Sequence, residues 1–222
     1  MKKYGGALFF LIFLVGQFTS CSKQDVRFVY NQDKEYVAIK QLKLKAEDLY
    51  QHPFQITPEQ LTNILDNIYY KHMMLIRYVW SKPKLTFSKR QQAFLAAHLS
   101  QALAQAGADE QVEFSIIDPE HERKRTNGKV FIDDQGLNLF LNSLHEPEYT
   151  TAVDRYELDE ARWKFWPLAP NQGYKCLQNN QKKCQKNWLV IKLPNGGASE
   201  NSNKNLADQL DAAYTSDQPG QD

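Results

Sequence analysis

The chain has 222 residues, of which 42% are hydrophobic and 24% are charged, and its formal net charge at pH 7 is +1. This is the composition of an ordinary globular protein. The near-neutral charge excludes the basic footprint expected of a nucleic-acid-binding protein.

The N-terminus has the layout of an export signal. Lys2 and Lys3 precede an unbroken apolar run at residues 7–15, ALFFLIFLV. A run of this length is typical of a signal-peptide core, which has roughly 7 to 15 apolar residues. It is too short for a transmembrane helix, which needs about 20. The sequence therefore predicts a removable signal peptide.

Residues 18–21, Phe-Thr-Ser-Cys, close this signal and resemble the lipobox of bacterial lipoproteins. Leucine is commoner than Phe18 in that motif, whereas the two small residues before Cys21 match it. The resemblance implies that Cys21 receives a diacylglyceryl group and becomes the acylated first residue after cleavage. Two or three acyl chains, such as palmitate, anchor a protein durably, whereas a single chain binds only marginally.

Ser22 bears on the destination, because aspartate at this position typically directs retention in the inner membrane of enteric bacteria. By the same resemblance, Ser22 favours the outer membrane. The alternative is an ordinary signal peptide that leaves Cys21 as a free thiol.

With Cys21 assigned to lipid, Cys176 and Cys184 remain. In an oxidising periplasm we expect this pair to form a disulfide that closes a small loop. The chain-entropy argument gives such a loop about 2 to 3 kcal/mol of stabilisation. A metal site is less favoured, because the spacing is not CxxC and the last histidine is His145.

The predicted organisation is a signal peptide at 1–20, a lipidated tether at 21–27, one domain at 28–194 and a flexible tail at 195–222. The tail is mostly Asn, Ser, Asp, Gln and Gly, which bury too little apolar surface to offset their conformational entropy. The alternative is a short amphipathic turn, or a partner contact, made by Leu206, Leu210 and Tyr214.

Two helices carry clear start signals. Thr57 is expected to cap the first, followed by Pro58 and by Gln60 three residues after the cap. Ser88 is expected to cap the second, and Gly107 to end it. The apolar stripes expected to be buried are Leu61, Ile64, Leu65 and Ile68 in the first helix and Leu95, Leu99, Ala102, Leu103 and Ala106 in the second.

The other apolar segments are typical of strands. The turn residues 133–136, DDQG, predict two antiparallel strands joined tightly, and the charged segment 118–128 is expected to be a solvent loop. The expected strands are 34–44, 69–80 as one or two strands meeting near His72 and Met73, 112–116, 129–133, 137–144 and 187–193. The predicted fold class is α+β, a mainly antiparallel sheet packed by two main helices.

Motifs for catalysis are missing from the sequence. It has no HExxH, no GxSxG and no glycine-rich phosphate loop. His98 is expected to be a half-buried structural residue, and His121 with Glu122 to lie in a solvated loop. The carboxylate pairs expected to form turns are Asp118 with Glu120 and Asp133 with Asp134. We therefore predict no catalytic residue, no metal site and no cofactor.

Candidate interaction residues lie in one aromatic segment, at Arg162, Trp163, Phe165 and Trp166. In a strand, Trp163 and Phe165 share one face, and Arg162, Lys164 and Trp166 share the other. Tryptophan and arginine are enriched in interface hot spots, which favours a contact with a protein or with peptidoglycan. The alternative is that these rings complete a small core.

These observations predict a periplasmic lipoprotein anchored in the outer membrane by its N-terminal acyl chains. It would bind another envelope protein or serve an assembly machine. The alternative is a cell-envelope hydrolase or carbohydrate-binding enzyme, with His98 or His121 beside an acid in a cleft. Residues 52–61, HPFQITPEQL, resemble a segment of uncharacterised proteobacterial lipoproteins, and this resemblance implies no activity.

Overall fold

The structure is a computed structural model that describes residues 26–74, 79–147, 163–176 and 183–193. The expected signal peptide, the lipidation residue Cys21 and the expected tail lie outside the described residues.

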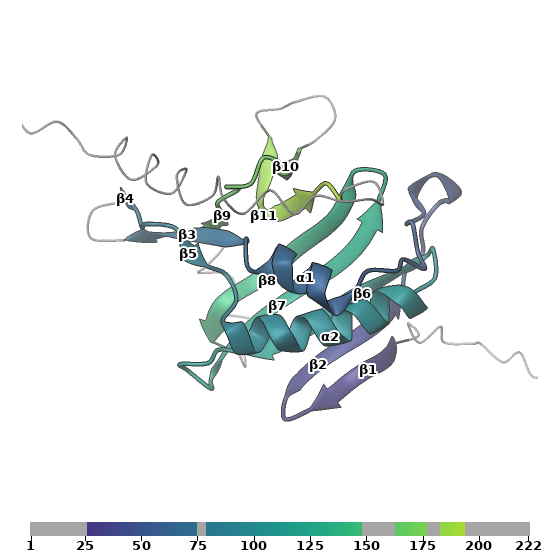
Figure 1. The fold of residues 1–222 in the computed structure, drawn as a ribbon, viewed down its shortest axis with the longest axis horizontal. Helices are drawn as coiled ribbons and strands as arrows, with labels where there is room; N and C mark the ends of the chain where they lie inside the picture. Colours follow the sequence, from purple (N-terminus) through teal and green to yellow (C-terminus); the bar gives the residue numbers. More distant parts are fainter. Residues whose placement is uncertain (1–25, 75–78, 148–162, 177–182, 194–222) are drawn as a thin grey trace, which may run out of the picture.

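A seven-stranded antiparallel sheet forms the body of the molecule, in the order β1-β2-β6-β7-β8-β11-β10. Its strands are β1 Val26–Gln32, β2 Glu35–Gln41, β6 Glu110–Ile117, β7 Lys124–Asp133, β8 Gly136–Pro147, β10 Gln172–Cys176 and β11 Cys184–Ile191. Figure 1 shows α1 (Pro58–Leu65) and α2 (Lys89–Gln105) lying across one face of this sheet. A 3₁₀ helix, η1, spans Ala46–Asp48. The predicted α+β class is confirmed.

A small second sheet is built around β3 (Tyr69–Met74). This strand pairs antiparallel with β4 (Val79–Trp80), β5 (Lys84–Leu85) and β9 (Trp163–Phe165). The small sheet lies beyond the first turn of α2, at one end of the molecule (Figure 1).

The hydrophobic core lies between the helices and the large sheet. Ile39, Val112, Val130, Leu139 and Leu189 are paired in register from β2 to β11, and each is at most 1% exposed. The α2 side chains buried in this core include Leu95, Ala96, Leu99, Ala102 and Leu103. Because side chains alternate along a strand, the residues between these core positions point to the opposite face, which α1 and α2 do not cover.

Both predicted helix starts are confirmed. Thr57 and Ser88 each form a capping box, with Gln60 and Gln91 as the reciprocal partners. The predicted end of α2 at Gly107 is correct to within one residue, because the helix ends at Gln105 and Ala106, its C-cap, is extended with ψ 141°. Ala106 is 1% exposed. The helix therefore ends where this alanine packs into the core, and Gly107 does not take the left-handed conformation of a glycine cap.

The N-terminal edge strand β1 was not predicted. It begins at Val26, so Val26 and Arg27 of the expected tether belong to the sheet. The Arg27 guanidinium lies 3.0 Å from the Glu110 carboxylate on β6. An edge strand with a register shift between Phe28 and Tyr30 shows little alternation in its sequence, and both Val26 and Phe28 are exposed.

The solvent loop predicted at 118–128 is wrong in its second half. Strand β7 begins at Lys124, and Arg125 and Thr126 are buried. The Arg125 guanidinium donates to Ser115 Oγ at 3.3 Å and to the Lys34 carbonyl oxygen, so hydrogen bonds satisfy this buried cation. Local charge density misled the prediction because these partners lie far away in the sequence, on β6 and in the turn between β1 and β2.

The strand boundary predicted near His72 and Met73 is also wrong, because β3 continues to Met74. Residues 70–72 pair with β9, which lies about ninety residues later in the chain. No local sequence pattern predicts the pairing of β3 with β9.

Candidate interaction surfaces

The predicted interaction residues divide between core and surface. Trp163 is 6% exposed and Phe165 is fully buried, whereas Trp166 is half-buried. Arg162 lies outside the described residues. Trp163 Nε1 donates to Glu146 Oε1 at 3.2 Å, and burial raises the pKa of the Glu146 carboxyl. Trp163 and Phe165 thus pack in the core, as the alternative reading of the aromatic segment expected.

The outer face of the small sheet is formed by Lys71, Trp80, Lys164 and Trp166, of which Lys71 is only 7% exposed, Lys164 and Trp166 are half-buried, and Trp80 is exposed. Lys71 pairs with Lys164 in register. The Lys71 ammonium lies 3.5 Å from the centre of the Trp166 ring, and the Lys164 ammonium lies 4.1 Å from the centre of the Trp80 ring. Such cation–π contacts are strongest where they are partly desolvated.

The pKa of the Lys164 ammonium reflects its burial and two neighbouring cations. Burial lowers the pKa of Lys164, and the neighbouring ammonium groups of Lys71 and Lys186 lower it further. Lys186 comes from β11 and lies 4.1 Å above the Tyr174 ring. Cations from three separate strands therefore meet beside two tryptophans.

A second aromatic group lies on the helix-free face of the large sheet, defined here by Tyr50, Phe131, Phe140 and Trp188. Tyr50 stacks on Phe131 with ring centres 4.3 Å apart, and Trp188 meets Phe131 and Phe140 edge to face at 5.8 and 5.6 Å. The Trp188 indole donates to Asn138 Oδ1 at 2.9 Å, which fixes the ring. Phe131 is 4% exposed, whereas Phe140 and Trp188 are half-buried, so the last two are the rings of this group through which a partner could make contact.

Sequence reasoning missed the helix-free face. The signal was present, because Phe131 lies between the core residues Val130 and Ile132 and must point away from them. Joining Phe131 to Trp188 requires the pairing of β8 with β11, which the sequence does not display.

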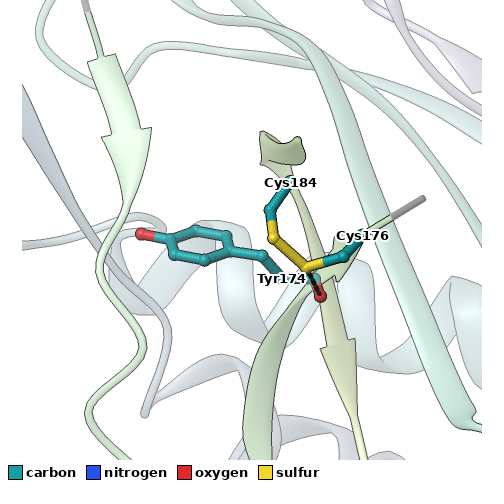
Figure 2. Close-up of a disulfide and its surroundings, with 3 residues drawn as sticks. All are labelled: Tyr174, Cys176 and Cys184. Atoms are coloured by element: carbon teal, nitrogen blue, oxygen red, sulfur yellow. Dashed lines mark hydrogen bonds between the residues drawn. A yellow bond between two sulfur atoms is a disulfide. The ribbon is translucent and has the colours of Figure 1, made fainter. Parts of the chain in front are cut away.

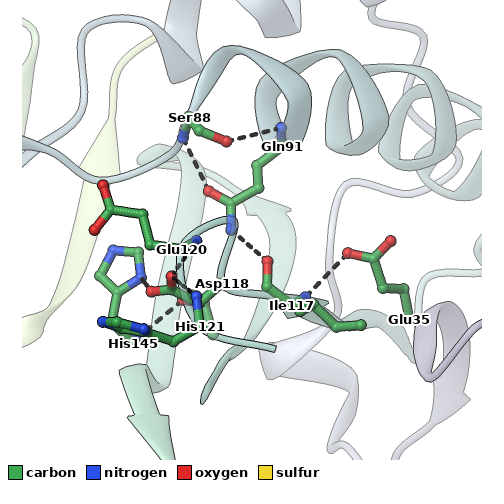
Figure 3. Close-up of polar contacts among 9 residues, drawn as sticks. Glu35, Ser88, Gln91, Ile117, Asp118, Glu120, His121 and His145 are labelled. Carbon is green, nitrogen blue, oxygen red and sulfur yellow. Dashed lines mark hydrogen bonds and ion pairs between the residues drawn. The ribbon is translucent and has the colours of Figure 1, made fainter. Parts of the chain in front are cut away.

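Asp118 forms the turn that was predicted and also holds a histidine (Figure 3). Its Oδ1 accepts from the backbone N–H of Glu120 at 2.8 Å and of His121 at 3.0 Å. Its Oδ2 lies 2.6 Å from His145 Nδ1, a close contact whose angles are not those of a hydrogen bond. Asp118 is 7% exposed, and a hydrogen bond from an imidazole to such a carboxylate would orient the ring as a general base.

Tyr70 lies next to this pair, with its ring centre 5.7 Å from that of His145. Burial raises the pKa of Tyr70, and Asp118 and Glu120 raise it further, so the phenol stays protonated at neutral pH. His145 itself has a backbone φ of 52°, in the left-handed region that is uncommon for a residue other than glycine.

The two histidines whose environment was predicted, His98 and His121, lie as expected. His98 is half-buried between Tyr30 and Phe94, with ring centres 4.6 and 4.7 Å away. His121 is exposed in the loop before β7.

The predicted disulfide is confirmed and joins Cys176 of β10 to Cys184 of β11 (Figure 2). The two cysteines face each other in the strand register. Cys176 Sγ lies 3.5 Å from the Tyr174 carbonyl oxygen; a disulfide sulfur carries no hydrogen, so this is a contact rather than a donated bond.

An open cavity of about 1000 Å³ lies between the β7–β8 turn and β10. Its lining is mixed, with Phe54 and Tyr174 beside Gln51, Asp134 and Asn171. Among the described residues, no group of three or more histidines, cysteines, aspartates or glutamates is placed to hold a metal ion. No helix in the described part of the chain has the length and apolarity needed to cross a bilayer.

Comparison with known proteins finds no matching family model, no matching curated protein and no matching solved structure.

Proposed function

We propose that this chain is an exported lipoprotein, anchored through acyl chains on Cys21 in the outer membrane and facing the periplasm, whose domain works by binding another envelope protein. The lipobox-like residues 18–21 support the anchor. The Cys176–Cys184 disulfide supports an oxidising compartment, since such bonds persist mainly outside the cytosol.

The observation that carries the binding role is the helix-free face. Tryptophan and tyrosine are enriched in interface hot spots because they offer large contact areas at a low cost in conformational entropy. Here the rings are held by one another and by Asn138, so little ordering remains to be done when a partner docks. The near-neutral charge of the chain favours a protein over nucleic acid as the partner.

In-cell photo-crosslinking tests this role. A photoreactive phenylalanine analogue at Phe140 should form one discrete adduct with an envelope protein, and the same analogue at the exposed residue Glu122 should not. Phe140→Ser should then weaken binding of the purified partner at least tenfold, whereas Glu122→Ser should leave it unchanged. Equal adducts at both positions would reject the helix-free face as the binding surface.

A second candidate function, a cell-envelope hydrolase, rests on the Asp118–His145 pair. A hydrolase should release soluble fragments from purified peptidoglycan, and Asp118→Asn should abolish that release while the fold is retained. Absence of release by the wild-type protein would leave the pair with a structural role, tying the loop after β6 to the end of β8.

A further inference from the structure

One row of side chains, each paired in register with the next, crosses the helix-free face of the large sheet. It runs over the adjacent strands β1, β2, β6, β7, β8 and β11, whose order can be followed in Figure 1. The members of the row are Phe28, Ala38, Glu113, Lys129, Phe140 and Trp188. Phe28 is 53% exposed and Trp188 is half-buried, so each end of the row is a large ring that solvent reaches.

This row is complementary to itself when its direction is reversed. Its midpoint lies between β6 and β7, and reversal about that point places Glu113 opposite Lys129, an acid opposite a base. Reversal also places the single methyl group of Ala38 opposite the ring of Phe140, and the two terminal rings opposite each other. A two-fold axis parallel to the strands produces this reversal in a second copy of the chain, as an isologous interface requires. Sheets pack face to face in this way, about 10 Å apart with their strands nearly aligned.

Both charged members of the row have bonding capacity left for a second copy. Glu113 Oε1 accepts from Lys40 Nζ at 3.0 Å and from Gln111 Nε2 at 2.8 Å, whereas Glu113 Oε2 has no hydrogen bond within the described part of the chain.

The Lys129 ammonium lies 4.8 Å from the centre of the Phe140 ring, and no carboxylate of the described residues forms an ion pair with it. Burial lowers the pKa of Lys129, although the Glu113 carboxylate raises it. A cation that a docked protein covers completely needs a carboxylate in contact, because an unpaired buried charge is strongly destabilising. A protein that docks on this face must therefore bring an acid to Lys129, and Glu113 of a second copy is such an acid.

The proposed lipid anchor favours the same rotation axis. Strand β1 begins at Val26, five residues after Cys21, and five residues span at most about 18 Å. A two-fold axis parallel to the strands keeps the start of β1 at the same end of both copies, so both anchors can enter one bilayer. A two-fold axis along the row would instead place the two anchors at opposite ends.

We infer that two copies of this chain dock through their helix-free faces as a two-fold symmetric dimer, in which Glu113 of each copy pairs with Lys129 of the other. The inference rests on the proposed function and names its partner, because the envelope protein bound by the helix-free face is then a second copy of the chain.

In-cell photo-crosslinking between two differently tagged copies of the full chain tests the inference. A photoreactive phenylalanine analogue at Phe140 of one copy should form an adduct of about twice the mass of the chain that carries both tags. Mass spectrometry of the adduct should place the crosslink in β2, near Ala38 of the other copy.

Charge reversal gives the matched variants. Glu113→Lys in both copies, or Lys129→Glu in both copies, sets like charges against each other at two contacts. Each contact should weaken the dimer about tenfold, or about 100-fold together, in sedimentation of the detergent-purified protein. One copy with Glu113→Lys and one with Lys129→Glu have opposite charges at both contacts again, and this mixed pair should recover the adduct. Glu122→Lys and Lys89→Glu reverse charges at exposed residues outside the row and should have little effect.

The two proposals fail in distinguishable ways. An adduct with a different protein would overturn the inference and keep the proposed function, whereas the absence of any adduct at Phe140 would reject both. A two-tag adduct that charge reversal leaves unchanged, or that the mixed pair does not recover, would overturn the two-fold arrangement.

Discussion

His52 is held in one protonation state by two backbone groups. Its Nδ1 donates to the Glu110 carbonyl oxygen at 3.0 Å, and its Nε2 accepts from the Ile132 backbone N–H at 3.1 Å. A proton on Nε2 would place two donors against each other. The ring is 7% exposed, and burial lowers the pKa of His52 although the Glu110 backbone hydrogen bond favours the charged form.

A lowered pKa in the folded state means that the unfolded chain binds more protons in the window below about pH 6.5. The contribution of His52 to stability is therefore present above that pH and is lost as the pH falls through the folded-state pKa. Denaturant titrations from pH 7.5 to 5 should show wild-type stability falling with acid, by at most about 1.4 kcal/mol per pH unit from this one group. His52→Gln should be less stable at pH 7.5 but less sensitive to acid, and an unchanged pH slope in that variant would contradict the assignment.

At the scale of the element, β7 packs so closely against its neighbouring strands at Gly128 that a larger residue does not fit. A Cβ on Gly128 would lie 2.6 Å from Leu141 Cδ2, 2.7 Å from the Phe140 carbonyl oxygen and 2.8 Å from Phe114 Cζ. All three distances are shorter than real Cβ contacts, and the backbone oxygen cannot move aside without disturbing the pairing of β7 with β8.

Gly128→Ala should therefore destabilise the protein by about 1 to 3 kcal/mol, the usual effect of overpacking a core. Gly173 provides the matched control, because a Cβ there meets nothing within 4 Å. Urea unfolding curves should separate the two variants clearly. Equal stabilities would show that β7 and β8 can move apart to accept a methyl group.

The β10–β11 hairpin depends on its disulfide. The bond joins cysteines 8 residues apart in the sequence, and the loop-closure relation for that length gives about 2.5 kcal/mol of stabilisation. Replacing both cysteines with serine should lower the unfolding free energy by about this amount, and reduction of the wild type should have the same effect. If the double variant unfolds at the wild-type denaturant midpoint, the bond does not stabilise the fold.

The elements that could be predicted from the sequence are those whose signals are local. The capping boxes at Thr57 and Ser88 each lie within four residues, and the turn before Gly136 joins adjacent strands. Strand β1 and the buried start of β7 were missed because their environment comes from distant residues, such as Ser115 for Arg125.

At the scale of the whole molecule, the candidate surfaces could not be predicted either, because they depend on contacts between residues far apart in the sequence. The aromatic segment at 163–166 was visible, but which rings are buried depends on the pairing of β9 with β3. Lys71, Lys164 and Lys186 come from β3, β9 and β11, and the sequence alone does not bring them together.

Mass spectrometry of the N-terminal peptide, from protein isolated from native membranes, tests the central claim of a lipid anchor most directly. We predict a mature chain that begins at Cys21 and carries a thioether-linked diacylglyceryl group, with Cys21→Ser moving the protein out of the acylated membrane fraction. A mature N-terminus elsewhere, or an unmodified Cys21 thiol, would contradict the account.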